Sequence, residues 1–187
     1  MSKSLKSGKA TRGVAAAMTL GAAVVIAFQA QAATSAASAS AKSVTSERFD
    51  GWNVACQDLP RQGVCALSES LNWKGTDRLA MLLEIHASAA HQETTVLMVP
   101  FGGLLAAGVT LQIDDQAPLA PRGYRTCLPQ GCVVPLTLDE SMLQAMRQGN
   151  VLKITLVLAS GGKANFSLPL TGFKPAYARF ESLRSIR

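Results

Sequence analysis

The sequence is poor in the residues that most catalytic sites depend on. Only two histidines occur among its 187 residues, His86 and His91, and a Ser-His-Asp or Cys-His arrangement would have to use one of them. Neither lies in a recognisable nucleophile motif, and the G-x-S-x-G pattern is absent. Gly102, Gly103 and Gly108 do not follow a phosphate-loop pattern. We therefore interpret both histidines as surface residues and expect no enzyme active site and no cofactor.

Two pairs of adjacent carboxylates are the remaining candidates for acid-base chemistry. We interpret Asp114-Asp115 as the end of a strand and Asp139-Glu140 as part of a helix start. A hydrolase or another enzyme of unrecognised type is the alternative function. A deep cleft that holds His86 or His91 beside a carboxylate would favour that alternative.

Metal and nucleic-acid binding also lack a basis in the sequence. The cysteine spacings are C-x8-C and C-x4-C, without the C-x2-C spacing of thiolate zinc sites, so we expect no metal. The full chain has a formal charge of +6, but four of its eighteen basic residues lie in an N-terminal segment that we expect to be removed. The remaining charge is 14 − 12 = +2, and no basic stripe with interleaved aromatic residues is left.

The first 32 residues have the pattern of a secretory signal peptide. Four basic residues precede an apolar segment, Gly13 to Phe28, that is short for a membrane span. Ala30-Gln31-Ala32 then gives the small-x-small pattern of a signal-peptidase site, and we expect cleavage after Ala32. An uncleaved anchor is the alternative. After cleavage no membrane-spanning segment would be left.

The mature chain of 187 − 32 = 155 residues has the length of one domain with a hydrophobic core. Residues 33–46 are small and polar, which predicts a flexible linker. The domain is expected to span residues 47–187.

All four cysteines lie in the mature chain, and an even number in an exported protein indicates disulfides in an oxidising compartment. Four cysteines allow three pairings, and the sequence alone does not decide among them. The local pairs Cys56–Cys65 and Cys127–Cys132 are favoured because each pair flanks a turn. Each closed loop is short, so each bridge is expected to add only ~2–3 kcal/mol of stability.

The turn between Cys127 and Cys132 has a clear signature. Pro129 suits the first central position of a type I turn, and Gly131 is expected in the left-handed conformation after it. We interpret this bridge as structural. A redox-active bridge is the alternative, because Arg125 lies two residues from Cys127 and would favour a thiolate.

Alternating apolar and polar residues predict many short strands. The segment 101–108 is apolar but contains three glycines, so we expect it to be irregular and packed against the core. Strands are expected near residues 49–56, 64–69, 79–86, 95–99, 109–114, 133–136, 152–158 and 166–170.

Two helices accompany these strands. Thr137 and Glu140 fit a capping box for a helix that Gly149 ends, and residues 173–183 resemble a terminal helix. Together these elements predict an all-β sandwich with a short internal helix and a C-terminal helix. The expected apolar faces are Met142, Leu143 and Met146 in the first helix, and Ala176, Tyr177, Phe180 and Leu183 in the second.

Two tryptophans are candidates for lining a binding groove. Trp52 alternates with core residues and is expected to be buried. Trp73 lies in a glycine-containing loop, 72–77, and is the better candidate for an exposed partner contact.

A series of motifs in a fixed order resembles the invasion-associated locus B family. It comprises Trp52-Asn53-Val54-Ala55-Cys56, then Cys65, then residues 99–109 (VPFGGLLAAGV), then Cys127-x4-Cys132, then Leu168-Pro169-Leu170-Thr171-Gly172-Phe173. The resemblance runs from about Phe49 to about Phe180. It implies an immunoglobulin-like β-sandwich in a bacterial periplasm, outer envelope or secreted fraction, and it provides no catalytic residues. The sequence thus favours a non-enzymatic module that binds an envelope or extracellular protein whose identity is unknown.

Overall fold

The structure is a computed structural model that describes residues 44–57, 64–87 and 93–185. The N-terminal strands are β1 (Val44–Phe49), β2 (Trp52–Gln57), β3 (Val64–Asn72), β4 (Leu79–Ala87) and β5 (Glu93–Val99). After the short 3-10 helix η1 (Leu105–Ala107), the chain forms β6 (Val109–Ile113), β7 (Thr126–Leu128) and β8 (Gly131–Leu136). Helix α1 (Glu140–Gln148), strands β9 (Val151–Val157) and β10 (Lys163–Pro169) and helix α2 (Phe173–Ser185) follow.

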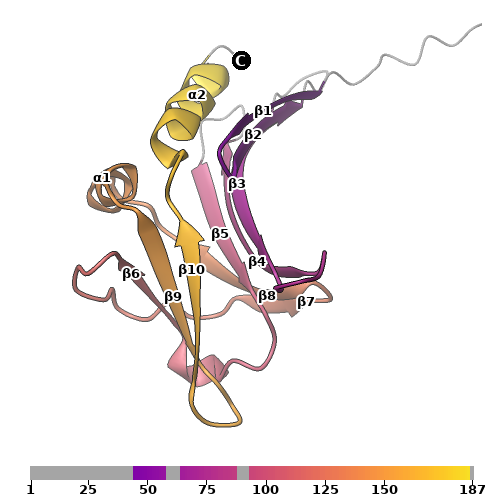
Figure 1. Ribbon diagram of the computed structural model, residues 1–187, viewed down its shortest axis with the longest axis vertical. Coiled ribbons are helices and arrows are strands. Elements are labelled where there is room, and N and C mark those ends of the chain that lie inside the picture. The colour runs from indigo at the N-terminus through magenta and orange to yellow at the C-terminus, as the bar shows by residue number, and fades with distance from the viewer. Residues whose placement is uncertain (1–43, 58–63, 88–92, 186–187) are drawn as a thin grey trace, which may run out of the picture. The chain divides into compact units, whose positions relative to one another are not determined.

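The strands form two antiparallel sheets that pack as a sandwich (Figure 1). The larger sheet has the order β1-β2-β3-β4-β5-β8-β7, and the smaller sheet has the order β10-β9-β6. The predicted fold class, an all-β sandwich with a short internal helix and a C-terminal helix, is therefore confirmed.

One hydrophobic core lies between the sheets, because each inner strand turns alternate side chains toward it. Met81, Leu83 and Ile85 of β4 are fully buried, as the alternation predicts. Leu152 and Ile154 of β9, in the smaller sheet, belong to the same core and are equally buried.

Helix α2 covers the core beside β1, β2 and β3. Its predicted apolar face is confirmed, since Ala176, Tyr177, Phe180 and Leu183 are all buried. Trp52, also buried as predicted, donates a 3.1 Å hydrogen bond from Nε1 to the Pro169 carbonyl. The Trp52 ring also meets the Phe173 ring edge-on at 4.8 Å between centroids.

The N-terminal strand differs from the expectation in two ways. β1 begins at Val44, inside the predicted linker, and the single strand expected near residues 49–56 is a hairpin. Phe49 pairs with Trp52 across the two-residue turn Asp50-Gly51, and Asp50 has a positive φ of 52°. Asp-Gly is a strong signal for such a turn, and it outweighs the apolar alternation across it.

Helix α1 begins later than the predicted capping box. The N-cap is Asp139, whose Oδ1 accepts hydrogen bonds from the Met142 amide at 2.8 Å and the Ser141 hydroxyl at 2.6 Å. The Thr137–Glu140 box is therefore wrong, because Asp139 offers a closer acceptor to the first helical turn. The predicted end of the helix at Gly149 is confirmed.

Candidate binding surface at the loop end

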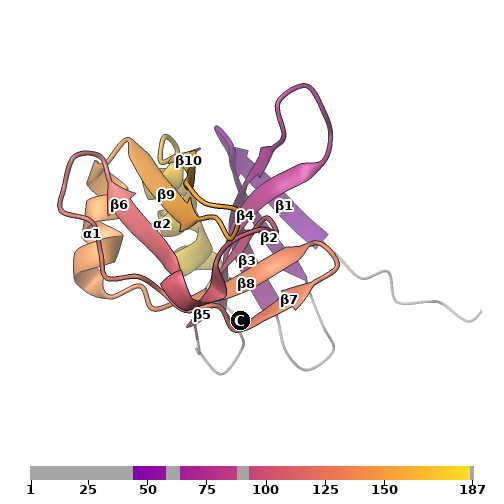
Figure 2. The same cartoon turned by 90° about the horizontal axis from the view of Figure 1, so that it is seen from below.

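Four connections meet at one end of the sandwich, which we call the loop end: β3–β4, β5–β6, β7–β8 and β9–β10. In Figure 1 the loop end lies below and α2 lies above, and Figure 2 views the molecule from this end. Six large apolar side chains of the described residues are exposed, and all six lie on or beside three of these connections. They are Trp73, Leu79, Phe101, Leu104, Leu105 and Leu128. Such clustering distinguishes a candidate interaction surface from apolar residues scattered singly over a surface.

A groove of about 600 Å³ opens among these connections. Its volume lies within the range of ligand pockets. The β3–β4, β5–β6 and β7–β8 connections, far apart in the sequence, all contribute to its walls. The lining residues are Trp73, Leu79, Pro100, Phe101 and Pro129, with Arg78 and Gln130 as the polar members.

The β3–β4 connection holds Trp73 in place through its own hydrogen bonds. The Trp73 amide donates to the Arg78 carbonyl at 2.9 Å, and the Thr76 amide donates to the Trp73 carbonyl at 2.9 Å. The Trp73 ring packs edge-on against Phe166 of β10, with 5.9 Å between centroids. The indole is nevertheless 43% exposed, so it presents a fixed apolar surface to solvent. This agrees with the expected exposure of Trp73, whereas its role as a partner contact stays a prediction.

The β5–β6 connection corrects the expectation that residues 101–108 pack against the core. Phe101, Leu104 and Leu105 are 59%, 44% and 60% exposed. The reason is that backbone hydrogen bonds, not side chains, anchor the segment. The Leu104 amide donates to the Val157 carbonyl at 2.8 Å, and the Gly102 carbonyl accepts from the Ala159 amide at 2.9 Å.

The β7–β8 hairpin forms the third wall and has a cysteine on each arm. Cys127 and Cys132 pair across the strands with their sulfur atoms 1.96 Å apart, so the favoured local pair lies at disulfide-bonding distance. Gly131 has a positive φ of 153°, a backbone conformation that residues with a side chain rarely adopt. A Cβ there would lie 2.6 Å from the Val99 carbonyl oxygen, so the close approach of β5 requires glycine.

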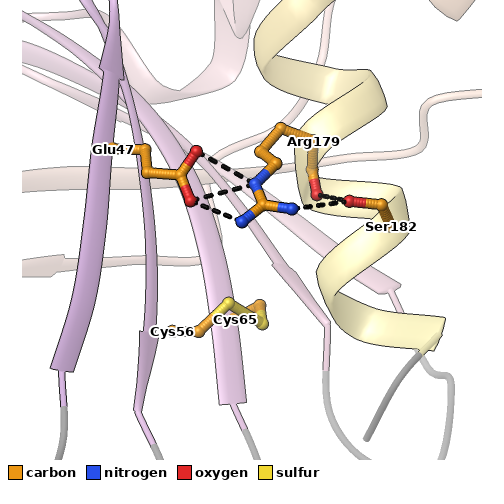
Figure 3. Close-up of polar contacts among 5 residues, drawn as sticks. All are labelled: Glu47, Cys56, Cys65, Arg179 and Ser182. Atoms are coloured by element: carbon orange, nitrogen blue, oxygen red, sulfur yellow. Dashed lines mark hydrogen bonds and ion pairs between the residues drawn. A yellow bond between two sulfur atoms is a disulfide. The ribbon is translucent and has the colours of Figure 1, made fainter.

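The second favoured pair, Cys56 and Cys65, lies far from the groove. These residues face each other on β2 and β3, with sulfur atoms 2.10 Å apart, and both side chains are buried. Figure 3 shows this bridge between the sheet and α2, near the ion pair of Glu47 and Arg179. The turn that the pair was predicted to flank lies outside the described residues.

Arg78 is the charged residue of the groove. Its side chain is exposed, and no carboxylate of the described residues lies within ion-pair distance of it. The β3–β4 connection also carries Lys74 and Asp77, both exposed, so its formal charge is positive. The groove therefore combines apolar walls with a guanidinium that has no ion-pair partner among the described residues.

The structure places the catalytic candidates apart from the groove. His86 lies on the outer face of β4, where its Nε2 contacts Glu84 Oε2 at 3.1 Å. This hydrogen bond raises the pKa of His86 above its ordinary value, while burial opposes the shift. Neighbouring strands place Ala66 and Thr94 opposite His86, on the outer face of the sheet. His91 lies outside the described residues.

The paired carboxylates serve as structural links, in agreement with their interpretation from the sequence. Asp114 accepts hydrogen bonds from the Asn150 and Val151 amides, which ties the end of β6 to the start of β9. Asp115 pairs with Lys153 at 2.9 Å, and Asp139 caps α1. Glu140 pairs with Arg147 at 2.9 Å.

A smaller cavity of about 190 Å³ lies between α1 and the segment after β6. Its carboxylate, Asp139, already accepts hydrogen bonds from the first turn of α1. Within residues 44–57, 64–87 and 93–185, no three His, Cys, Asp or Glu side chains are grouped so that they could hold a metal ion. The groove is therefore the better candidate site, because it has the larger volume and exposed apolar side chains line it.

Sequence reasoning identified Trp73 but missed its neighbours in the groove. Phe101 was assigned to a core-packed segment, and neither Arg78 nor Leu79 carried a distinguishing local pattern. One signal was available in the apolar segment 101–108, because three glycines interrupt both the helical and the strand periodicity there. An apolar segment that forms neither element has no regular way to bury its side chains.

The chain is similar to proteins of one bacterial family. Residues 52–181 match the family described as invasion associated locus B (IalB) protein. An invasion protein B homolog of Brucella abortus is 32% identical over 143 residues, which is 75% of this chain and 82% of that protein. Invasion protein B of Bartonella bacilliformis is 29% identical over 142 residues, which is 74% of this chain and 75% of that protein.

A solved structure shares the fold. The crystal structure of invasion associated protein B from Bartonella henselae matches with a TM-score of 0.68 at 28% sequence identity, over 75% of this chain and 97% of that chain. The helices in the described part of the present chain are too short or too polar to cross a bilayer. Every residue of the groove lies within the matched region 52–181.

Proposed function

The chain belongs to the invasion-associated locus B family, and from this premise we propose that it is an exported, non-enzymatic module that binds a protein partner through its loop-end groove. The observation that carries the proposal is the gathering of exposed apolar residues around a groove whose guanidinium, that of Arg78, has no ion-pair partner in the described part of the chain. Loops displayed at the end of a rigid sandwich are a common place for recognition.

Two features support export. Residues 1–32 have the pattern of a cleavable signal, and both cysteine pairs lie at disulfide-bonding distance. Structural disulfides persist in oxidising compartments, so the proposal places the mature protein in the periplasm, in the outer envelope or outside the cell.

The enzymatic alternative has weaker support. His86 contacts a carboxylate, Glu84, but on the outer face of a sheet and away from both cavities described above. The relatives are named for invasion and not for a reaction. Their names describe those proteins, and the proposal assigns no host-cell role to this chain.

Site-specific photo-crosslinking tests the proposal in cells that produce the full chain. With p-benzoylphenylalanine in place of Trp73, we expect irradiation to attach a discrete partner protein. The matched control places the same crosslinker at Lys174, an exposed residue on α2, away from the loop end. Equal products at both positions, or none at position 73, would contradict the proposed surface.

The captured partner then allows a direct affinity measurement. We expect Trp73→Ala to weaken binding to the purified partner by about tenfold or more, because aromatic residues at the centre of an interface contribute strongly. Lys174→Ala should leave the affinity unchanged. An unaltered affinity for the Trp73 variant would reject this groove as the binding site.

A further inference from the structure

We propose that the groove takes an extended apolar segment of the partner protein that carries an acidic side chain, and that this carboxylate pairs with Arg78. This inference rests on the proposed function, because it names the chemistry of the partner for the same groove.

The charge of Arg78 sets the first requirement. An occupant that contacts Trp73, Leu79 and Phe101 would also exclude water from the neighbouring guanidinium. Burial of a charge without a partner is costly, and no carboxylate of the described chain is within ion-pair distance of Arg78. The occupant must therefore supply the acceptor, and a carboxylate matches the planar guanidinium with two parallel hydrogen bonds.

The apolar walls set the second requirement. Trp73 and Phe101 stand in the same groove as Pro100 and Pro129, which together offer aromatic and ring surfaces. Trp and Arg are the residue types most often found to dominate binding energy. Aromatic or large aliphatic side chains beside the carboxylate would complement these walls.

The walls are also held before binding. Hydrogen bonds within the β3–β4 connection fix Trp73, and the Cys127–Cys132 bridge fixes the hairpin that carries Pro129. A preorganised groove loses little conformational entropy on binding, so more of the interaction energy is left to offset the ordering of a flexible occupant.

Self-association is disfavoured by charge. A twofold contact brings the same surface of both copies together, so two β3–β4 connections would meet. Each carries Lys74 and Arg78 against Asp77 alone, and therefore a net positive charge. A bilayer is also a poorer fit than a chain segment, because a flat surface does not fill a groove of about 600 Å³.

Selection from a random peptide library displayed on phage tests the inference with the purified, exported protein. We expect enriched peptides to combine Asp or Glu with aromatic or large aliphatic residues. A synthetic peptide of the enriched sequence should lose about tenfold or more in affinity for Arg78→Ala, and Lys174→Ala is the matched control. Arg78→Glu should bind weakly, and should recover when the acidic residue of the peptide is changed to lysine.

The outcomes separate the two proposals. In one outcome, the enriched peptides contain no acidic residue, bind Trp73→Ala weakly and bind Arg78→Ala as tightly as the unaltered protein. That result would overturn the inference about the carboxylate, but the groove would still be the binding site. Peptides insensitive to both variants, or no enrichment over a blank support, would count against both. Binding of the protein to vesicles that contain phosphatidylglycerol is also measured. If the unaltered protein binds the vesicles and Trp73→Ala does not, the occupant of the groove is a lipid surface and the proposed protein segment is rejected. If the protein dimerises with increasing concentration and Trp73→Ala abolishes this dimerisation, the occupant of the groove is a second copy of the chain.

Discussion

The carboxylate of Glu47 on β1 binds the guanidinium of Arg179 on α2 through three hydrogen bonds of 2.6–2.9 Å (Figure 3). The two residues are 132 positions apart in the sequence. Arg179 is further held by Ser182, whose hydroxyl donates to the Arg179 carbonyl at 2.8 Å. The contact between Glu47 and Arg179 therefore joins the first described strand to the last helix.

The Glu47–Arg179 pair predicts a change in stability at acid pH. The hydrogen bond from Arg179 lowers the pKa of Glu47 below its ordinary value of 4.5. Its stabilising effect is therefore complete above pH 4.5 and is lost as pH falls through the lowered pKa. We expect Glu47→Gln to lower the melting temperature at pH 7 and to reduce its fall at acid pH. Thermal unfolding between pH 3 and pH 7 measures this, with Asp77→Asn as the control; identical profiles would contradict the prediction.

Glu69 predicts the opposite dependence on pH. It is 7% exposed, its Oε2 has no hydrogen-bond partner among the described residues, and burial raises its pKa to about 7. The folded state therefore holds the proton up to a higher pH than the unfolded state does. The stability that this proton provides is present below pH 4.5 and is lost as pH rises through about 7.

We therefore expect Glu69→Gln to stabilise the protein at pH 8 by about 1–3 kcal/mol and to have little effect at pH 4.5. Urea unfolding at the two pH values measures the difference. The result would be contradicted if the variant were less stable at pH 8 than the unaltered protein.

Tyr124 and Gly103 predict a compensating pair of substitutions. The Tyr124 hydroxyl is buried without a hydrogen-bond partner among the described residues, and a Cβ on Gly103 would overlap it. Gly103→Ala should therefore destabilise the β5–β6 connection. Tyr124→Phe alone should be neutral or stabilising by up to about 1 kcal/mol, since it removes an unsatisfied polar group. A double-mutant cycle of Gly103→Ala and Tyr124→Phe measures the coupling from the free energies of unfolding in urea. If the two changes in free energy simply add, the predicted contact between residues 103 and 124 is rejected.

The two disulfide pairs predict different losses. Replacement of Cys127 and Cys132 by alanine should lower stability by at most about 2–3 kcal/mol, because the closed loop is short. It should also weaken groove binding, because Pro129 and Gln130 lie on the released hairpin. Replacement of Cys56 and Cys65 should lower stability without affecting the groove. Melting curves and the affinity for the enriched peptide are measured for both variants. If both variants lower the affinity equally, the prediction is contradicted.

The structural role of the Cys127–Cys132 bridge is tested separately by a redox titration of the exported protein. We expect glutathione mixtures of moderate potential to leave this bridge closed. Reversible opening in those mixtures would support the redox-active alternative.

Cleavage after Ala32 is the prediction that concerns the N-terminus. The basic segment, the apolar segment and Ala30-Gln31-Ala32 together form the expected signal. N-terminal sequencing of the exported protein should begin at Ala33. A chain that begins at Met1 would reject the secretory interpretation.

Periodicity predicted the parts of the fold in which each side chain's environment follows from its neighbours. Leu152 and Ile154 alternate on a buried strand, and Phe180 lies on the apolar face of a helix. The split between β1 and β2 was missed because the apolar alternation continues across Asp50-Gly51. The start of α1 was misplaced because Asp139 competes with Thr137 for the same cap.

The candidate site was less predictable than the fold because its walls come from three distant connections. Trp73 was identified from its loop, but no local pattern links residue 73 to residue 101 or 129. Their proximity is a consequence of strand order, since β3, β5 and β7 end at the same end of the sandwich. Arg78 became a candidate only from the structure, where it lines the groove and forms no ion pair with another described residue.

The Trp52–Pro169 and Glu47–Arg179 contacts also constrain the order in which the chain can fold. The first hairpin reaches its buried state only when partners 117 and 132 residues later in the sequence have arrived. Contacts of such long sequence separation form slowly and late. A growing chain would thus leave Trp52 without its Pro169 acceptor and without the Phe173 ring until the end of the chain has been made.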